Sequence, residues 1–148
     1  MFKRIAWIFV FLAARISLYI YFYTVDSDLR IVGVSFSHIQ LQSLALSALF
    51  FLRDAAIEEL FFRLIPIVLA MKSTPKNLFL PLAIVLSSVI FGAAHGDSVV
   101  VYETLAGIMY SIIFIVTGSN KKEYLAAFCV VVACHFIFNM FMFCISFS

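Results

Sequence analysis

The chain has 148 residues, of which 65% are hydrophobic and 12% are charged, whereas soluble domains average about 45–50% apolar and about 25% charged residues. The 10 basic and 8 acidic side chains are too few to cover a soluble fold that must also bury 18 Phe and 6 Tyr side chains. The composition therefore indicates a membrane protein and excludes a nucleic-acid-binding module, a secreted disulfide scaffold and a disordered tail. Its three cysteines are interpreted as small buried apolar residues.

Five apolar segments predict membrane-spanning helices. They cover residues 5–23, 39–70, 78–95, 99–117 and 124–147, with short polar stretches between them. Each segment is close to or longer than the roughly 20 residues that an apolar helix needs to cross the bilayer. We therefore expect one all-α domain over residues 1–148, a polytopic transmembrane helix bundle with about five spans in contact with membrane lipid.

Basic residues predict the orientation of this bundle. If five spans alternate in direction, six lysines and arginines fall on one side of the membrane and only Arg30 falls on the other. Positive residues favour the cytoplasmic side, so the N-terminus is expected to be cytoplasmic. The six residues are Lys3, Arg4, Lys72, Lys76, Lys121 and Lys122.

A few polar residues lie inside the apolar segments. An ionisable side chain at the centre of a bilayer costs about 2.5–3.5 kcal/mol, so each one is a candidate for function. Arg15 and the Arg53-Asp54 pair are interpreted as snorkelling or paired near an interface, and Glu103 as part of a solvated helix start. The remaining candidates are Glu58, Glu59, Arg63, His95, His135 and Asn139.

Helical geometry predicts how these candidates face one another. Glu59 and Arg63 are four residues apart and can form an ion pair on one helix face. Glu58 is rotated by about 100° from Glu59 and can point elsewhere. His135 and Asn139 are also four residues apart on one stripe of the last helix. At about 1.5 Å per residue their depths overlap with those of Glu58 and His95, so one polar pocket is expected.

Such a pocket suits the activation of water. A carboxylate surrounded by apolar side chains becomes a stronger base, and a histidine can orient the same water. A second histidine and an amide can donate hydrogen bonds to the oxyanion that forms when water attacks a peptide carbonyl. The residues therefore predict peptide hydrolysis inside the membrane.

Three motifs, in this order on three apolar helices, resemble those of the CAAX-processing and bacteriocin-processing (CPBP, or Abi) family of intramembrane proteases. The resemblance covers residues 45–145, which we take as the catalytic core. The motifs are Glu58-Glu59-x-x-x-Arg63, Phe91-x-x-x-His95 and His135-x-x-x-Asn139.

The resemblance implies a role for each motif residue. Glu58 would be the general base, with His95 as its partner. Glu59 and Arg63 would shape the site, and His135 with Asn139 would form the oxyanion hole. We expect a glutamic-type endopeptidase with no cofactor, because no His-Glu-x-x-His sequence is present to form a zinc site.

Zinc is the alternative that the resemblance leaves open, since the family was long described as metal-dependent. Glu58, His95 and His135 would then be its ligands.

Small members of the family resemble proteases of C-terminal sorting tails. We therefore expect a membrane-anchored protein or peptide substrate, cleaved near its C-terminal tail, and an integral protein of a prokaryotic cell (inner) membrane. The alternative function is non-enzymatic: self-immunity against a bacteriocin, or another peptide-binding role in the membrane.

Overall fold

All the regular structure in the described part of the chain is helical, which confirms the all-α prediction. The computed structural model describes residues 2–25, 44–96, 99–118 and 123–145. Arg30, Lys121 and Lys122, which entered the orientation argument, lie outside these residues. The elements are α1 (Phe2–Val25), α2 (Leu44–Glu59), the π-helix η2 (Leu60–Leu64), α3 (Ile65–Lys72), α4 (Lys76–Ala94), α5 (Val100–Thr117) and α6 (Tyr124–Ile145).

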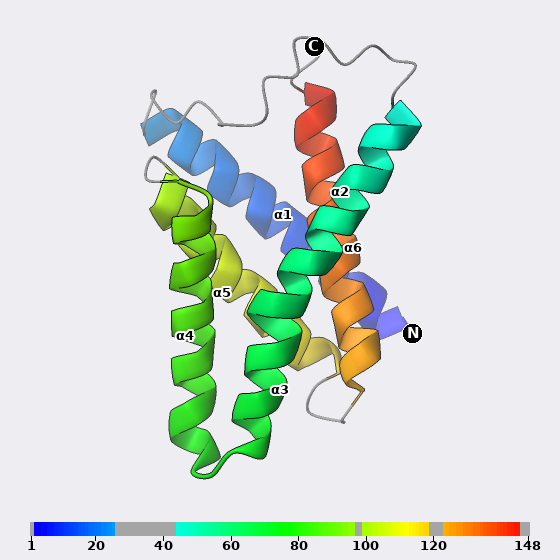
Figure 1. Cartoon of the computed structure of the whole chain (residues 1–148). Coiled ribbons are helices and arrows are strands. Elements are labelled where there is room, and N and C mark those ends of the chain that lie inside the picture. The colour runs from blue at the N-terminus through cyan, green and yellow to red at the C-terminus, as the bar shows by residue number, and fades with distance from the viewer. Residues whose placement is uncertain (1, 26–43, 97–98, 119–122, 146–148) are drawn as a thin grey trace.

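The second expected span is a single rod in which α2, η2 and α3 follow one another without a break (Figure 1). In the π turn, the backbone N–H of Ile65 donates to the carbonyl of Leu60, five residues back. Pro66 follows at once, near the start of α3. Proline has no N–H to donate, and its ring crowds the carbonyl four residues earlier, which gives a physical reason for the wider turn at this place.

The other four expected spans are also present. The helical segments Ala6–Thr24, Asn77–Ala94, Val100–Thr117 and Tyr124–Ile145 are long and apolar enough to cross a membrane. The α2–η2–α3 rod is less apolar because it contains Arg53, Asp54, Glu58, Glu59 and Arg63. Together with this rod, the structure is consistent with about five spans.

The helices alternate in direction as the orientation argument requires. In Figure 1 the end of α3, the start of α4, the end of α5 and the start of α6 lie in the lower half, as does the N-terminal end of α1. The start of α2, the end of α4 and the end of α6 lie in the upper half. That the lower end is cytoplasmic stays a prediction.

Aromatic side chains from different helices form the centre of the bundle. Phe11, Phe91, Tyr110 and Phe114 are all buried there, together with Cys134. Cys129 and Cys144 are exposed, so the interpretation of all three cysteines as buried was wrong for two of them. The apolar environment of a membrane explains the difference, since a lipid-facing helix surface accepts cysteine as readily as a core does.

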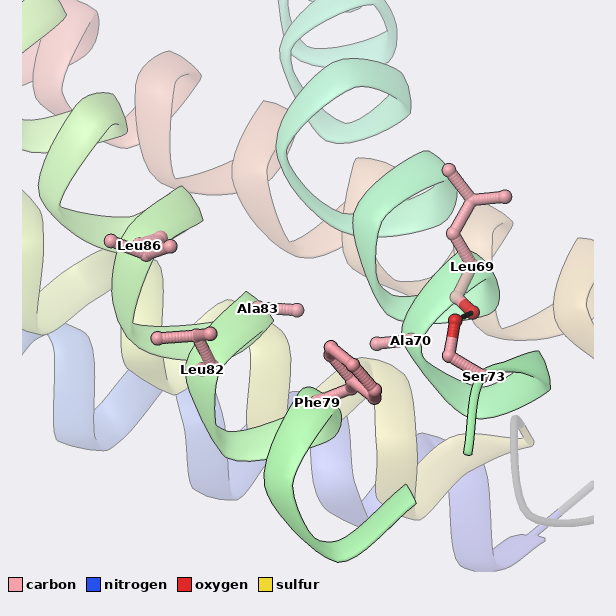
Figure 2. A pocket seen from close by; sticks show the side chains of 7 residues that line it. All are labelled: Leu69, Ala70, Ser73, Phe79, Leu82, Ala83 and Leu86. Carbon is pink, nitrogen blue, oxygen red and sulfur yellow. Dashed lines mark hydrogen bonds between the residues drawn. The ribbon is translucent and has the colours of Figure 1, made fainter. Parts of the chain in front are cut away.

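A small crevice lies between α3 and α4 (Figure 2). At about 1.5 Å per residue, Leu69 in its wall is roughly 16 Å along the rod from Glu58. Apart from Ser73, whose hydroxyl donates to the carbonyl of Leu69, the wall is apolar. Its residues are Leu69, Ala70, Ser73, Phe79, Leu82, Ala83 and Leu86.

The predicted orientation can be tested by cysteine labelling. In a variant without the native cysteines, Asn120→Cys should react with a membrane-impermeant maleimide only after the cells are permeabilised, because residue 120 belongs to a basic loop. Ser98→Cys, in the connection between α4 and α5, is the matched control and should react in intact cells. The reverse labelling pattern would show that the N-terminus is outside.

Candidate active site

Five of the six predicted site residues come together in the middle of the bundle. Glu58 and Glu59 end α2, Arg63 lies in η2, His95 follows the last residue of α4, and His135 lies in α6. The Glu58 carboxylate oxygen Oε2 is 3.6 Å from Nε2 of His135 and 3.8 Å from Nε2 of His95. Both imidazoles therefore face one carboxylate oxygen.

The inner part of the site is a buried ion-pair network centred on Glu59. The side chains of Glu59 and Arg63 are fully buried, and Arg63 Nε lies 3.3 Å from Glu59 Oε2. The other oxygen, Oε1, lies 2.8 Å from Nδ1 of His135. The i,i+4 pair expected from the sequence is thus present, and His135 joins it from another helix.

Arg63 is packed between aromatic and small residues. Its guanidinium carbon lies 4.1 Å from the centre of the Phe91 ring, a cation–π distance. Gly107 of α5 leaves room for it, since a Cβ atom at that position would lie 3.1 Å from Arg63 Nη2 and 3.0 Å from the Ser88 backbone. Phe91 and Gly107 therefore form the walls that hold the guanidinium in place.

His95 is oriented by its own helix. Its Nδ1 lies 2.8 Å from the backbone carbonyl of Phe91, four residues earlier. A carbonyl only accepts hydrogen bonds, so Nδ1 is assigned the hydrogen and Nε2 is left facing Glu58. The Phe91 ring also packs on the imidazole, with ring centres 4.4 Å apart. The spacing Phe-x-x-x-His thus fixes the orientation of the histidine.

The two sides of the site differ in how exposed their side chains are. The Glu58 and His95 side chains are each 30% exposed, whereas His135 is 5% exposed and Glu59 is fully buried. Glu58 and His95 therefore form the partly exposed side of the site, and the Glu59 network lies behind them.

Among the described residues, no hydrogen bond or ion pair joins Asn139 to this cluster. It is half-buried on α6, one turn beyond His135 and about 6 Å from it along the helix axis. Its expected role in an oxyanion hole stays a prediction.

Comparison with known proteins identifies the family. A family model described as type II CAAX prenyl endopeptidase Rce1-like matches residues 40–141. The chain belongs to this family. No curated protein and no solved structure matched it.

The Rce1-like match covers the three motifs and leaves α1 outside. It confirms the resemblance seen in the sequence. Membership supports an intramembrane endopeptidase activity of the CAAX type, acting on a protein or peptide, and makes the chain an integral membrane protein.

The donor atoms agree only in part with the zinc alternative. Both histidines have their Nδ1 atoms held by oxygen acceptors and their Nε2 atoms free to face Glu58, as is common for zinc ligands. Within the described part of the chain, however, no three His, Cys, Asp or Glu side chains are arranged so that they could hold a metal ion. The absence of a metal stays a prediction.

Sequence reasoning missed Tyr110 and misjudged two charged residues. The Tyr110 ring is stacked on that of His135, with centres 4.8 Å apart and planes at 24°.

Arg15 is buried inside the bundle rather than near an interface. Glu103 is its partner rather than part of a solvated helix start, and Nη2 of Arg15 lies 2.9 Å from Oε2 of Glu103. Arg15 and Glu103 are opposite charges inside two apolar segments, and this pattern could have predicted that they form an ion pair.

The buried and exposed arginines of the rod predict very different mutant stabilities. Arg63→Met should lower the free energy of unfolding by about 3–5 kcal/mol, because it leaves the buried Glu59 carboxylate without its cation. The matched control is Arg53→Met, which removes a largely exposed ion pair with Asp54 and should cost about 1 kcal/mol or less. Unfolding of both variants in detergent micelles measures the difference. Equal losses would show that the Glu59–Arg63 pair does not stabilise the fold.

Proposed function

We propose that this chain is a glutamic-type intramembrane endopeptidase that cleaves a membrane-anchored protein or peptide near its C-terminal tail. The observation that supports the proposal most directly is that Oε2 of Glu58 faces the Nε2 atoms of both His95 and His135. A partly exposed glutamate whose Oε2 faces two oriented imidazoles is an arrangement that suits water activation.

Charge balance supports an assignment of the protons. Glu58 and Glu59 carry two negative charges and Arg63 carries one positive charge, so a neutral site needs one more proton in a medium of low dielectric constant. His135 is the better position for it, because it lies against both carboxylates and is stacked on the Tyr110 ring. We therefore treat His135 as doubly protonated and His95 as neutral, with a free lone pair on Nε2.

In this state, a water molecule at hydrogen-bonding distance, about 2.8 Å, from Glu58 Oε2 and His95 Nε2 can donate one hydrogen to each. Glu58 takes a proton as the water oxygen attacks the carbonyl carbon of the substrate. The oxyanion that forms accepts hydrogen bonds from Nε2 of His135 and from the Asn139 amide. Glu58 then passes its proton to the amide nitrogen, the C–N bond breaks, and an acid and an amine leave.

The position of the site favours a peptide that enters from the end of the bundle at which α4 ends. His95 follows α4 at the end of the bundle opposite to the α3–α4 turn. With the N-terminus cytoplasmic, this end faces outward, and we propose that the protein lies in the cell membrane of a prokaryote with Glu58 open to this side. An extended peptide entering beside His95 would bring its carbonyl to Glu58.

The role of Glu58 is tested by Glu58→Gln, which keeps the size of the side chain and removes the base. Cleavage of an internally quenched farnesylated peptide ending in Cys-aliphatic-aliphatic-X, and of the same peptide without the lipid, should fall by about 100- to 10,000-fold. Asp54→Asn, an exposed acid one turn earlier on α2, is the matched control and should keep full activity.

Cleavage that survives Glu58→Gln would contradict the mechanism. A non-enzymatic immunity function would instead give protection of cells that survives both Glu58→Gln and His135→Gln. A preference for the lipid-free peptide would favour an unmodified tail over a prenylated substrate.

Metal dependence is tested on the purified protein. Activity should persist after dialysis against a strong chelator, and elemental analysis should find zinc well below one ion per chain. The physical reason is that Glu58 itself supplies the base that zinc would otherwise generate from bound water. Loss of activity on chelation with recovery on adding zinc would overturn the metal-free proposal.

A further inference from the structure

Helix α1 lies outside the region matched by the family, yet two of its side chains pack against Tyr110, beside the active site. Phe11 and Arg15 are one helical turn apart and both are buried. The Phe11 ring centre lies 4.8 Å from that of Tyr110, and the guanidinium carbon of Arg15 lies 5.9 Å from it. Tyr110 in turn is stacked on His135.

Arg15 also links three helices at this level of the bundle. Its Nη2 donates to both carboxylate oxygens of Glu103 on α5, at 3.1 and 2.9 Å. Its guanidinium carbon lies 4.1 Å from the centre of the Tyr102 ring on α5 and 4.5 Å from that of Phe138 on α6. Phe138 is three residues after His135, so the Arg15 group packs one turn away from the histidine on the same helix.

We propose that Arg15 and Phe11 of α1 are positioning residues for His135, holding Tyr110 flat against its imidazole. The geometry of the ring matters because His135 must present Nδ1 to Glu59 and Nε2 to Glu58 at the same time. Tyr110 covers one face of this ring, and Phe11 and Arg15 limit where Tyr110 can lie. Neither α1 residue contacts the groups proposed to react.

The charges of the Arg15–Glu103 ion pair are compatible with a positioning role of Arg15. The charged groups that face His135 are Glu58 and Glu59 of α2, Arg63 of η2 and, beyond Tyr110, the Arg15–Glu103 pair. Glu103 neutralises Arg15, so the pair adds no net charge beside an imidazolium. A buried ion pair can often be replaced by apolar residues without loss of stability, so packing of α1 alone does not require an arginine here.

The test compares Arg15→Met and Phe11→Leu with two matched controls. Arg53→Met removes an exposed ion-paired arginine, and Phe9→Leu changes a phenylalanine that is 69% exposed on the same helix. With the farnesylated peptide as substrate, kcat of Arg15→Met and Phe11→Leu should fall about 10- to 100-fold, the loss expected when a catalytic group is displaced by about 1 Å. KM should stay unchanged, and both controls should keep the kcat of the parent protein.

A second measurement does not depend on cleavage. In protein with isotope-labelled histidines, the ring protons of His135, assigned with His135→Gln, should be displaced upfield by the stacked Tyr110 ring. This displacement should shrink in Arg15→Met and Phe11→Leu and stay in the controls. Arg15→Lys, which keeps the cation for Glu103, should recover part of both the kcat and the displacement.

The kcat comparison in this test rests on the proposed function. Different results would overturn the proposed function and the positioning role. Activity retained by Glu58→Gln would overturn the proposed mechanism and leave the His135 signals to decide the role of α1. A folded Arg15→Met protein with parental kcat and parental His135 signals would overturn the positioning role. If Arg15→Met does not fold, the same comparison is made with Phe11→Leu, and parental values there overturn it equally.

Discussion

The buried carboxylate of Glu59 is the centre on which the rest of the site depends. It is fully buried, with Arg63 on one oxygen and His135 on the other. The ion pair with Arg63 lies within the rod, whereas the contact with His135 joins the rod to α6, so the burial of this carboxylate favours the packing of the two elements. The same contact orients His135 toward Glu58, so one interaction serves both the fold and the site.

Two neighbouring glutamates have separate surroundings because of the helix geometry. Glu59 points into the bundle toward Arg63, whereas Glu58 is rotated toward the Nε2 atoms of His95 and His135. The π turn that follows gives Arg63 its place against Phe91, and Pro66 supplies a local reason for that turn. A structural carboxylate and a reactive one can therefore lie side by side in the chain.

Aromatic rings separate the charged groups from lipid and from one another. Phe91 packs on both Arg63 and His95, and Tyr110 packs on His135. These rings exclude water and keep the local dielectric constant low, which strengthens the remaining ion pairs and hydrogen bonds. Helix α1 extends the same arrangement, since Phe11 and Arg15 pack on the far side of Tyr110.

The sequence by itself determined the membrane class, the helical architecture, the Glu59–Arg63 pair and the family, because these depend on composition, apolar length and i,i+4 spacing within one helix. Only the tertiary structure decided that His135 bonds to Glu59, that both imidazoles face Glu58, and that Arg15 pairs with Glu103, 88 residues away in the chain. Contacts between helices depend on how each helix is rotated and tilted against the next, and no periodicity within a single segment specifies that rotation. The exposed positions of Cys129 and Cys144 have the same origin, because in lipid an apolar residue is accepted both in the core and on the membrane-facing surface.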